Sequence, residues 1–202
     1  MINDLNPTEK YPALTDDRLS LIADNLRDVR NTTLELYDPL GGDDGWSHGC
    51  RVYSRSRYRL TQLSQQYGWL SIVEEDARLR FTFAIEGIPI RFYRGSPEDP
   101  PAHYLVTTYG ELAQRQLFTH RELDSILRIA VETDREGRVS TVKLVELDKA
   151  GEPTGVYLIP FAVAATNVTS FEAKAVHVDP VELEPVVNNE SNVRKQKTKK
   201  AK

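Results

Sequence analysis

The sequence has few of the features by which common protein classes are recognised. Cys50 is its single cysteine, so an intrachain disulfide and a zinc site made of several cysteines are both excluded. No apolar run approaches the roughly 20 residues that cross a bilayer. The first residues have neither the basic n-region nor the apolar h-region of a signal peptide. We therefore expect a cytoplasmic protein without a membrane segment.

Nucleotide-binding and hydrolase signatures are also missing. The patterns G-x-x-x-x-G-K-[ST], G-x-G-x-x-G and G-x-S-x-G do not occur. Three of the four histidines are isolated and lack the spacing of a metal-binding helix: His103, His120 and His177. We therefore expect no cofactor and select no catalytic residue or metal ligand.

Charge is distributed unevenly along the chain. The charged fraction of 28% and the hydrophobic fraction of 40% are typical of a globular protein. Residues 194–202 carry six of the 26 basic residues, which leaves 20 against 30 acidic ones, a net charge of −10 for the rest of the chain. We expect a disordered basic tail over residues 181–202. The alternative is a tail that contacts nucleic acid or an acidic partner.

The first helix is predicted to begin after Thr15. A threonine can cap a helix, and Asp16 and Asp17 place negative charge at the positive end of the helix dipole. The apolar residues beyond them form one stripe at spacings of three and four: Leu19, Ile22, Leu26 and Val29. Pro39 ends this pattern. Residues 1–14 show no regular pattern, and we expect an irregular lead-in there.

The segment 51–67 has two interpretations. Its arginines alternate as in a strand, whereas its apolar residues recur as in a helix: Leu60, Leu63 and Tyr67. We favour a helix over at least residues 56–67, ended by Gly68. A helix that starts earlier would place three arginines on one face: Arg51, Arg55 and Arg59. A short strand over residues 69–74 is predicted to follow.

Residues 78–94 give the clearest structural signal, a β-hairpin. A turn at Glu86-Gly87 places Ile85 opposite Ile88, and every further pair keeps its side-chain parity. One face is then apolar and faces the core: Leu79, Phe81, Phe83, Ile85, Ile88, Ile90 and Phe92. Pro89 has no N–H to donate, so its strand is expected to have an edge near the turn.

The remaining chain is predicted to add helices and strands. Capping boxes at 108–111 and 119–122 indicate two helix starts, and a helix-like stripe follows the second: Leu123, Ile126, Leu127 and Ala130. Strands are expected at 139–147, 156–163 and 170–178. This order predicts a single α+β domain over residues 15–180. Its sheet is mostly antiparallel, made of the hairpin and a C-terminal meander, and packs with three to four helices.

The outward face of the hairpin is our candidate partner-binding site. Alternation places four side chains there: Arg78, Arg80, Arg91 and Tyr93. Arginine and tyrosine are favoured in protein interfaces, and they also suit stacking and phosphate contacts with single-stranded nucleic acid. Four further arginines are assigned to the same site: Arg51, Arg55, Arg57 and Arg59. The alternative is a solvated or helix-covered sheet face, where arginine stems lie over apolar surface.

Three functional hypotheses follow from these residues. The first is a non-enzymatic protein that binds a macromolecular partner, preferably a protein, through the Arg/Tyr face. The second is a nucleic-acid-associated accessory protein that uses the same face and the basic tail, although the acidic body disfavours it. The third is a metal-dependent hydrolase built on Asp43, Asp44 and His48, and no other residue pattern supports it. The oligomeric state is not predicted.

Overall fold

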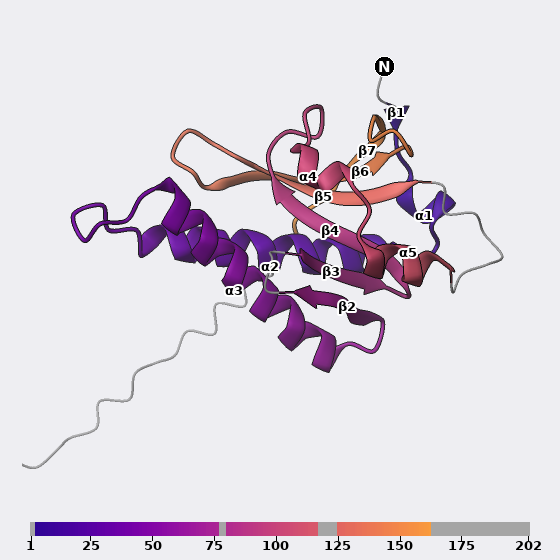
Figure 1. Ribbon diagram of the computed structural model, residues 1–202, viewed down its shortest axis with the longest axis horizontal. Helices are drawn as coiled ribbons and strands as arrows, with labels where there is room; N and C mark the ends of the chain where they lie inside the picture. The colour runs from indigo at the N-terminus through magenta and orange to yellow at the C-terminus, as the bar shows by residue number, and fades with distance from the viewer. Residues whose placement is uncertain (1–2, 77–79, 117–124, 163–202) are drawn as a thin grey trace, which may run out of the picture. The chain divides into compact units, whose positions relative to one another are not determined.

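A seven-stranded mixed sheet organises the part of the chain that the computed structural model describes, residues 3–76, 80–116 and 125–162 (Figure 1). The strands are β1 (Asn3–Asp4), β2 (Leu70–Asp76), β3 (Arg80–Ile85), β4 (Ile88–Arg94), β5 (Ile126–Thr133), β6 (Val139–Leu147) and β7 (Pro153–Leu158). Their order across the sheet is β1-β7-β6-β5-β4-β3-β2. Only β1 with β7 and β4 with β5 are parallel. The predicted α+β class and mostly antiparallel sheet are confirmed.

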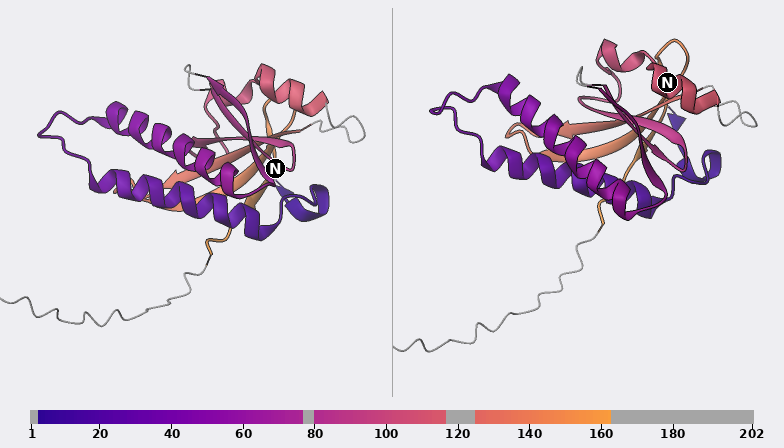
Figure 2. Two further views of the ribbon diagram at one scale, coloured as in Figure 1. Left: turned by 90° about the horizontal axis from the view of Figure 1, so that it is seen from below. Right: turned by 60° about the horizontal axis from the view of Figure 1, so that its bottom comes forward.

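Helices cover both faces of this sheet. They are α1 (Pro7–Lys10), α2 (Asp16–Glu35), α3 (Gly45–Gln66), α4 (Ala102–Leu105) and α5 (Tyr109–Gln116). Figure 2 shows α2 and α3 side by side along one face, with α4 and α5 on the other. None of the helices in the described ranges is both long enough and apolar enough to cross a membrane.

The main core lies between the sheet and the pair α2–α3. The predicted stripe of the first helix enters it, with Leu19, Ile22 and Leu26 all buried. The strands contribute the predicted core face of the hairpin and the apolar residues of β5 and β6: Phe81, Phe83, Ile85, Ile90, Phe92, Leu127, Ile129, Val131, Val142 and Leu144. A smaller core on the opposite face lies beneath α4.

The predicted hairpin is present with the predicted register. Ile85 pairs with Ile88, and Phe83 pairs with Ile90. Both turn residues, Glu86 (φ 46°) and Gly87 (φ 82°), lie in the left-handed region that a tight hairpin turn requires. Pairing of β4 with β5 begins only at Ile90. The missing N–H of Pro89 therefore interrupts no ladder between these strands, as the sequence predicts.

The prediction of a helix after the second capping box is wrong. Residues 126–133 form strand β5, which pairs with β4 on one side and with β6 on the other. A strand that is buried on both faces reads as a nearly continuous apolar run, and such a run imitates the stripe of a helix. The box itself, residues 119–122, and Leu123 lie outside the described residues.

Several boundaries also differ from prediction. Helix α3 begins at Gly45, because Asp44 and Ser47 form a reciprocal capping box, with Asp44 Oδ1 accepting from Ser47 N at 2.7 Å. Residues 3–14, expected to be irregular, contribute β1 and α1. The last described strand, β7, ends earlier than expected. The predicted strand 170–178 and the predicted tail 181–202 lie outside the described residues.

Candidate binding cleft

The hairpin residues selected from the sequence do not form an exposed surface. Arg91 and Tyr93 lie on the sheet face that α4 and α5 cover, and they are only 3% and 2% exposed. The expectation of an outward Arg/Tyr face is therefore wrong for these two residues, and the helix-covered alternative describes them correctly. Arg78 and the side chain of Arg80 lie outside the described residues.

Two of the four predicted arginines of α3 join it to α2. Three of the four share one face, as an early helix start predicts, and each reaches a residue in α2 or in the turn before α3: Arg51 pairs with Asp43, Arg55 donates to Thr33 at 3.3 Å, and Arg59 donates to Asn25 at 2.6 Å. Arg57 lies elsewhere, beside the rings of Tyr53 and Phe81. The structure therefore does not join these four arginines and the hairpin into one surface.

A buried polar cluster lies between the sheet and α5. Arg91 of β4 pairs in register with Arg128 of β5. Glu111 of α5 reaches Arg128 with both oxygens, at 2.5 Å from Nη1 and 3.3 Å from Nη2. Arg128 Nε also donates to the carbonyl of Tyr104 at 2.8 Å. Arg128 is fully buried, and its burial, opposed by the attraction of Glu111, lowers the pKa of its guanidinium.

Glu111 of this cluster also caps the N-terminus of helix α5. It forms the predicted capping box with Thr108: Thr108 N donates to Glu111 Oε2 at 2.8 Å, and Glu111 N donates to Thr108 Oγ1 at 3.2 Å. The sequence prediction of this helix start is confirmed. The carboxylate that caps α5 is thus also the partner of Arg128, and both of its oxygens accept hydrogen bonds.

Arg91 is the weakly satisfied member of the cluster. Its Nη1 donates to the carbonyl of Val106 at 3.3 Å and lies 3.9 Å from Glu111 Oε2. Its Nε is buried and has no hydrogen-bond partner among the described residues. The ring of Tyr104 lies 4.8 Å from its Cζ. An unpaired buried donor costs roughly 1–3 kcal/mol, so this arrangement favours a ligand that accepts from Arg91.

Arg91 forms part of the wall of a cleft of about 910 Å³. The cleft lies between the first half of α3, the end of β4 and residues 103–109. Tyrosine, tryptophan and phenylalanine rings from α3, β4, α4 and α5 line it: Trp46, Tyr53, Phe92, Tyr93, Tyr104 and Tyr109. The lining residues with a permanent charge are all arginines, Arg30, Arg91 and Arg94, and none of the described lining residues is acidic. We call this site the arginine cleft.

The titration properties of the lining keep the arginine cleft positive and its tyrosines neutral. Burial raises the pKa of Tyr53 to about 12 and also raises the pKa values of Tyr93 and Tyr104. Burial and repulsion from Arg94 lower the pKa of Arg30. Because a guanidinium remains charged in proteins, the site presents cations and neutral phenols at physiological pH.

The two aspartates of the metal-dependent hypothesis have other partners. Asp44 caps α3, and Asp43 pairs with Arg51 and accepts from Asp38 N at 2.8 Å. The His48 ring is buried beside Tyr37, and burial together with nearby arginines lowers its pKa. Within the described ranges, no group of three or more His, Cys, Asp or Glu side chains is placed to hold a metal ion. Asp44 and His48 thus belong to the capped N-terminal end of α3.

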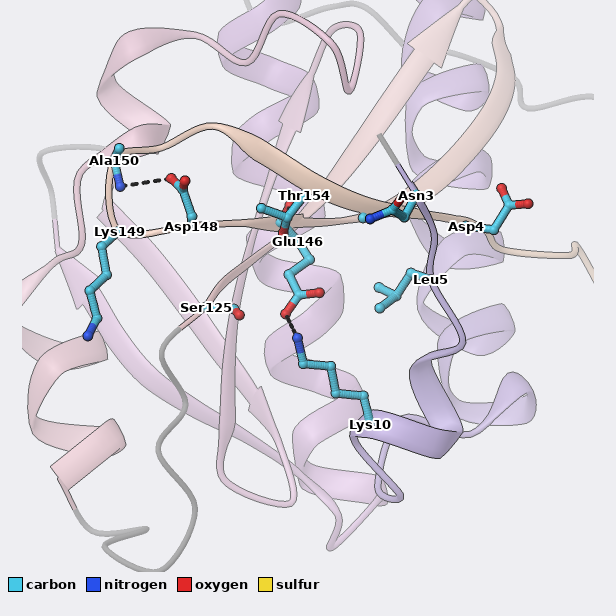
Figure 3. Close-up of a pocket in the computed structure, with 11 residues that line it drawn as sticks. Asn3, Asp4, Leu5, Lys10, Ser125, Glu146, Asp148, Lys149, Ala150 and Thr154 are labelled. Carbon is cyan, nitrogen blue, oxygen red and sulfur yellow. Dashed lines mark hydrogen bonds and ion pairs between the residues drawn. The ribbon is translucent and has the colours of Figure 1, made fainter. Parts of the chain in front are cut away.

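A second cavity, of about 750 Å³, lies where the N-terminal segment meets the sheet (Figure 3). Glu146 of β6 points into it, contacts Lys10 and accepts from the Tyr11 hydroxyl at 2.7 Å. Burial opposes ionisation of Glu146, but hydrogen bonds from Lys10, Ser125 and Tyr11 outweigh it and lower the pKa of Glu146. Glu146 thus joins Lys10 of α1 and the following Tyr11 to β6, and these contacts fasten α1 to the sheet.

This fastening predicts a pH-dependent effect of Glu146→Gln. At neutral pH the variant should lose about 1–3 kcal/mol of unfolding free energy, since the charged hydrogen bonds are gone. The folded pKa of Glu146 lies below the ordinary value of 4.5, so wild type loses the same contribution as the pH falls below that value. Denaturation from pH 7 downward should show the two proteins converging. The exposed Glu152, changed to Gln, serves as the control and should differ little from wild type.

The sequence interpretation missed most residues of the arginine cleft. In the buried polar cluster beside it, Glu111 was visible only as half of a capping box, and Arg128 only as one charge in the apolar run Ile126–Val131. Trp46 and Tyr109 carried no signal, because each is an isolated aromatic residue in a polar segment.

No family model, no curated protein and no solved structure matches this chain.

Proposed function

We propose that this chain is a binding protein without enzymatic activity that holds a segment of a protein partner in the arginine cleft. The observation that carries the proposal is the combination of arginines, aromatic rings and no acidic residue in one concave site of an otherwise acidic chain. Clefts of several hundred Å³ with a mainly apolar lining and few polar groups are typical ligand-binding sites.

The rim of the arginine cleft favours a protein as the occupant. Trp46 is 77% exposed, Tyr109 is 84% exposed, and Val106 beside them is also exposed. Large apolar side chains that remain in water next to buried arginines have the composition of an interface hot spot. A segment seated between Trp46 and Tyr109 would remove both rings from water.

The distribution of charge disfavours a nucleic acid in this site. A nucleic acid strand brings one negative charge per nucleotide, and each needs a cation along the groove. Of the three arginines in the cleft, only Arg94 is exposed. Arg91 and Arg30 are buried, and Arg30 Nε donates to the carbonyl of Gly137 at 2.8 Å. The acidic body would repel the rest of the strand. One or two carboxylates with apolar neighbours fit better.

Selection from a random peptide library tests the proposal. Peptides selected against the full chain should bind wild type and lose about tenfold or more in affinity to Trp46→Ala and to Tyr109→Ala, since each truncation removes a rim ring. Tyr58→Ala is the matched control, because Tyr58 is an exposed aromatic residue of the same helix that does not line the cleft. Affinities are measured by titration calorimetry.

Two results would contradict the proposal. Peptides that bind both rim variants as tightly as wild type would place the site elsewhere. An oligothymidylate that binds more tightly than the selected peptides, with an affinity that falls steeply with salt, would support the nucleic-acid hypothesis instead.

A further inference from the structure

We infer that the wall of the arginine cleft contains a seat for one carboxylate, formed by Arg91. The inference rests on the proposed function and gives the partner segment a chemical identity: an Asp or Glu side chain, or a terminal carboxylate, next to an aromatic or large apolar group. The carboxylate would accept from Arg91, and its neighbour would pack among the rings of the lining.

The hydrogen bonds around Arg91 leave one edge of its guanidinium without a partner in the described part of the chain. Nη1 is directed to Val106 O and Glu111. Nε, on the other edge, has no partner among the described residues although the side chain is 96% buried. The edge formed by Nε and Nη2 is the planar fork that a carboxylate meets with two parallel hydrogen bonds.

Glu111 does not complete this fork. It is already bound by both Nη atoms of Arg128 and by Thr108 N, and its nearest approach to Arg91 is 3.9 Å. Two further acidic side chains on this side of the sheet are not paired with Arg91: Glu132 of β5 pairs with Lys143 at 2.7 Å, and Glu74 stands on β2, which β3 separates from β4. No hydrogen bond or ion pair among the described residues supplies an acceptor to Arg91 Nε, and we assign that role to a ligand.

The surroundings of Arg91 select a small anion with an aromatic or apolar neighbour. The ring of Tyr104 lies over the guanidinium at 4.8 Å and covers one of its faces, so a carboxylate would meet Arg91 along the edge of the guanidinium. Arg30 and Arg94 add positive potential, whereas the neutral phenols of Tyr53 and Tyr93 add none. Because the local dielectric is low, one charge-assisted pair here is stronger than at an exposed site.

A pair of isosteric probes tests the seat on the wild-type chain. Hydrocinnamate and hydrocinnamide have the same shape and the same phenyl ring, and only the first has a charge. Heteronuclear NMR titration should show hydrocinnamate binding about tenfold or more tightly, the effect of a hydrogen bond to a charged group. Cys50 is the single cysteine and lines the cleft, so protection of its thiol from a reactive dye shows that the probe is bound there.

Variants assign the preference to Arg91. Arg91→Gln should abolish the difference between the two probes, and Arg91→Lys should restore only part of it, because an ammonium lacks the planar fork. Arg135→Gln is the control, an exposed arginine that does not line the cleft, and should change affinity by less than about threefold. Should Arg91→Gln fail to fold, the wild-type comparison with thiol protection decides.

Each contrary result overturns a distinct claim. Equal affinity for the two probes, or a preference that survives Arg91→Gln, removes the carboxylate seat. Tighter binding of phenyl phosphate than of hydrocinnamate would replace the carboxylate with a phosphate monoester. Selected peptides that bind through the rim without any acidic residue would leave the proposed function standing and the seat refuted. A clear carboxylate preference with no peptide ligand would keep the seat and reject the protein partner.

Discussion

Replacing Glu111 with glutamine is expected to lower the free energy of unfolding by about 3–5 kcal/mol, the cost of breaking a buried ion pair by removing one partner. Arg128 and Arg91 would then be two buried guanidinium groups facing no carboxylate. The substitution is nearly isosteric, so the loss would reflect charge and not a cavity. The capping bond from Thr108 N to the side-chain oxygen can persist in the amide.

Removing Arg128 should cost less than removing Glu111. In Arg128→Met the remaining charges, Glu111 and Arg91, are balanced one to one and already lie 3.9 Å apart. Arg91 can then move toward the freed oxygens, and the residual loss is the unsatisfied Tyr104 carbonyl, about 1–3 kcal/mol. Because two arginines share one carboxylate, we expect Glu111→Gln to lose more unfolding free energy than Arg128→Met.

Chemical denaturation of the three proteins measures this asymmetry. Glu35→Gln is the control, because Glu35 pairs with Arg138 at 3.6 Å with both side chains exposed, and its loss should stay within about 0.5 kcal/mol. Equal losses for Glu111→Gln and Arg128→Met would mean that Arg91 does not share Glu111. A larger loss for Arg128→Met would contradict the assignment of Glu111 as the common partner.

Local sequence patterns predicted the parts of the fold that local chemistry determines. The register of the hairpin followed from one turn and strict alternation, and it is observed at Ile85–Ile88 and Phe83–Ile90. The capping box at Thr108 is observed because the two groups that form it are three residues apart. The shared face of Arg51, Arg55 and Arg59 needed only the 3.6-residue period of a helix, once the helix began at Gly45.

The candidate site depended on topology, which those patterns do not contain. Alternation correctly placed Arg91 and Tyr93 opposite the apolar face, but it cannot say whether that side meets water. Strands β4 and β5 are parallel, and a parallel pair requires a crossover connection that lies across one face of the sheet. That connection contains α4 and α5, so it buries both residues and creates the wall of the arginine cleft.

The segment 126–131 shows how one pattern can serve two structures. Its residues Ile126, Leu127 and Ala130 fit a helical stripe, and a helix would leave Ile129 off that stripe. As a central strand, β5 instead alternates, with Ile129 facing α2–α3 and Arg128 and Ala130 facing α4–α5. Ile129 is fully buried. A strand buries Ile129 in the core, whereas a helix would place it off the apolar stripe, so Ile129 distinguishes the two interpretations.

Ile129→Ala is accordingly expected to destabilise the protein by about 2–5 kcal/mol, the range for creating a cavity in a packed core. Ile129→Val should cost only about 0.5–1.5 kcal/mol, because one methylene is lost and the β-branched shape is kept. Val29→Ala, in a half-buried position of α2, provides a comparison with a smaller expected loss. Denaturant midpoints and slopes measure all three. A loss below about 0.5 kcal/mol for Ile129→Ala would be the behaviour of a surface residue, and it would favour the helix over the strand.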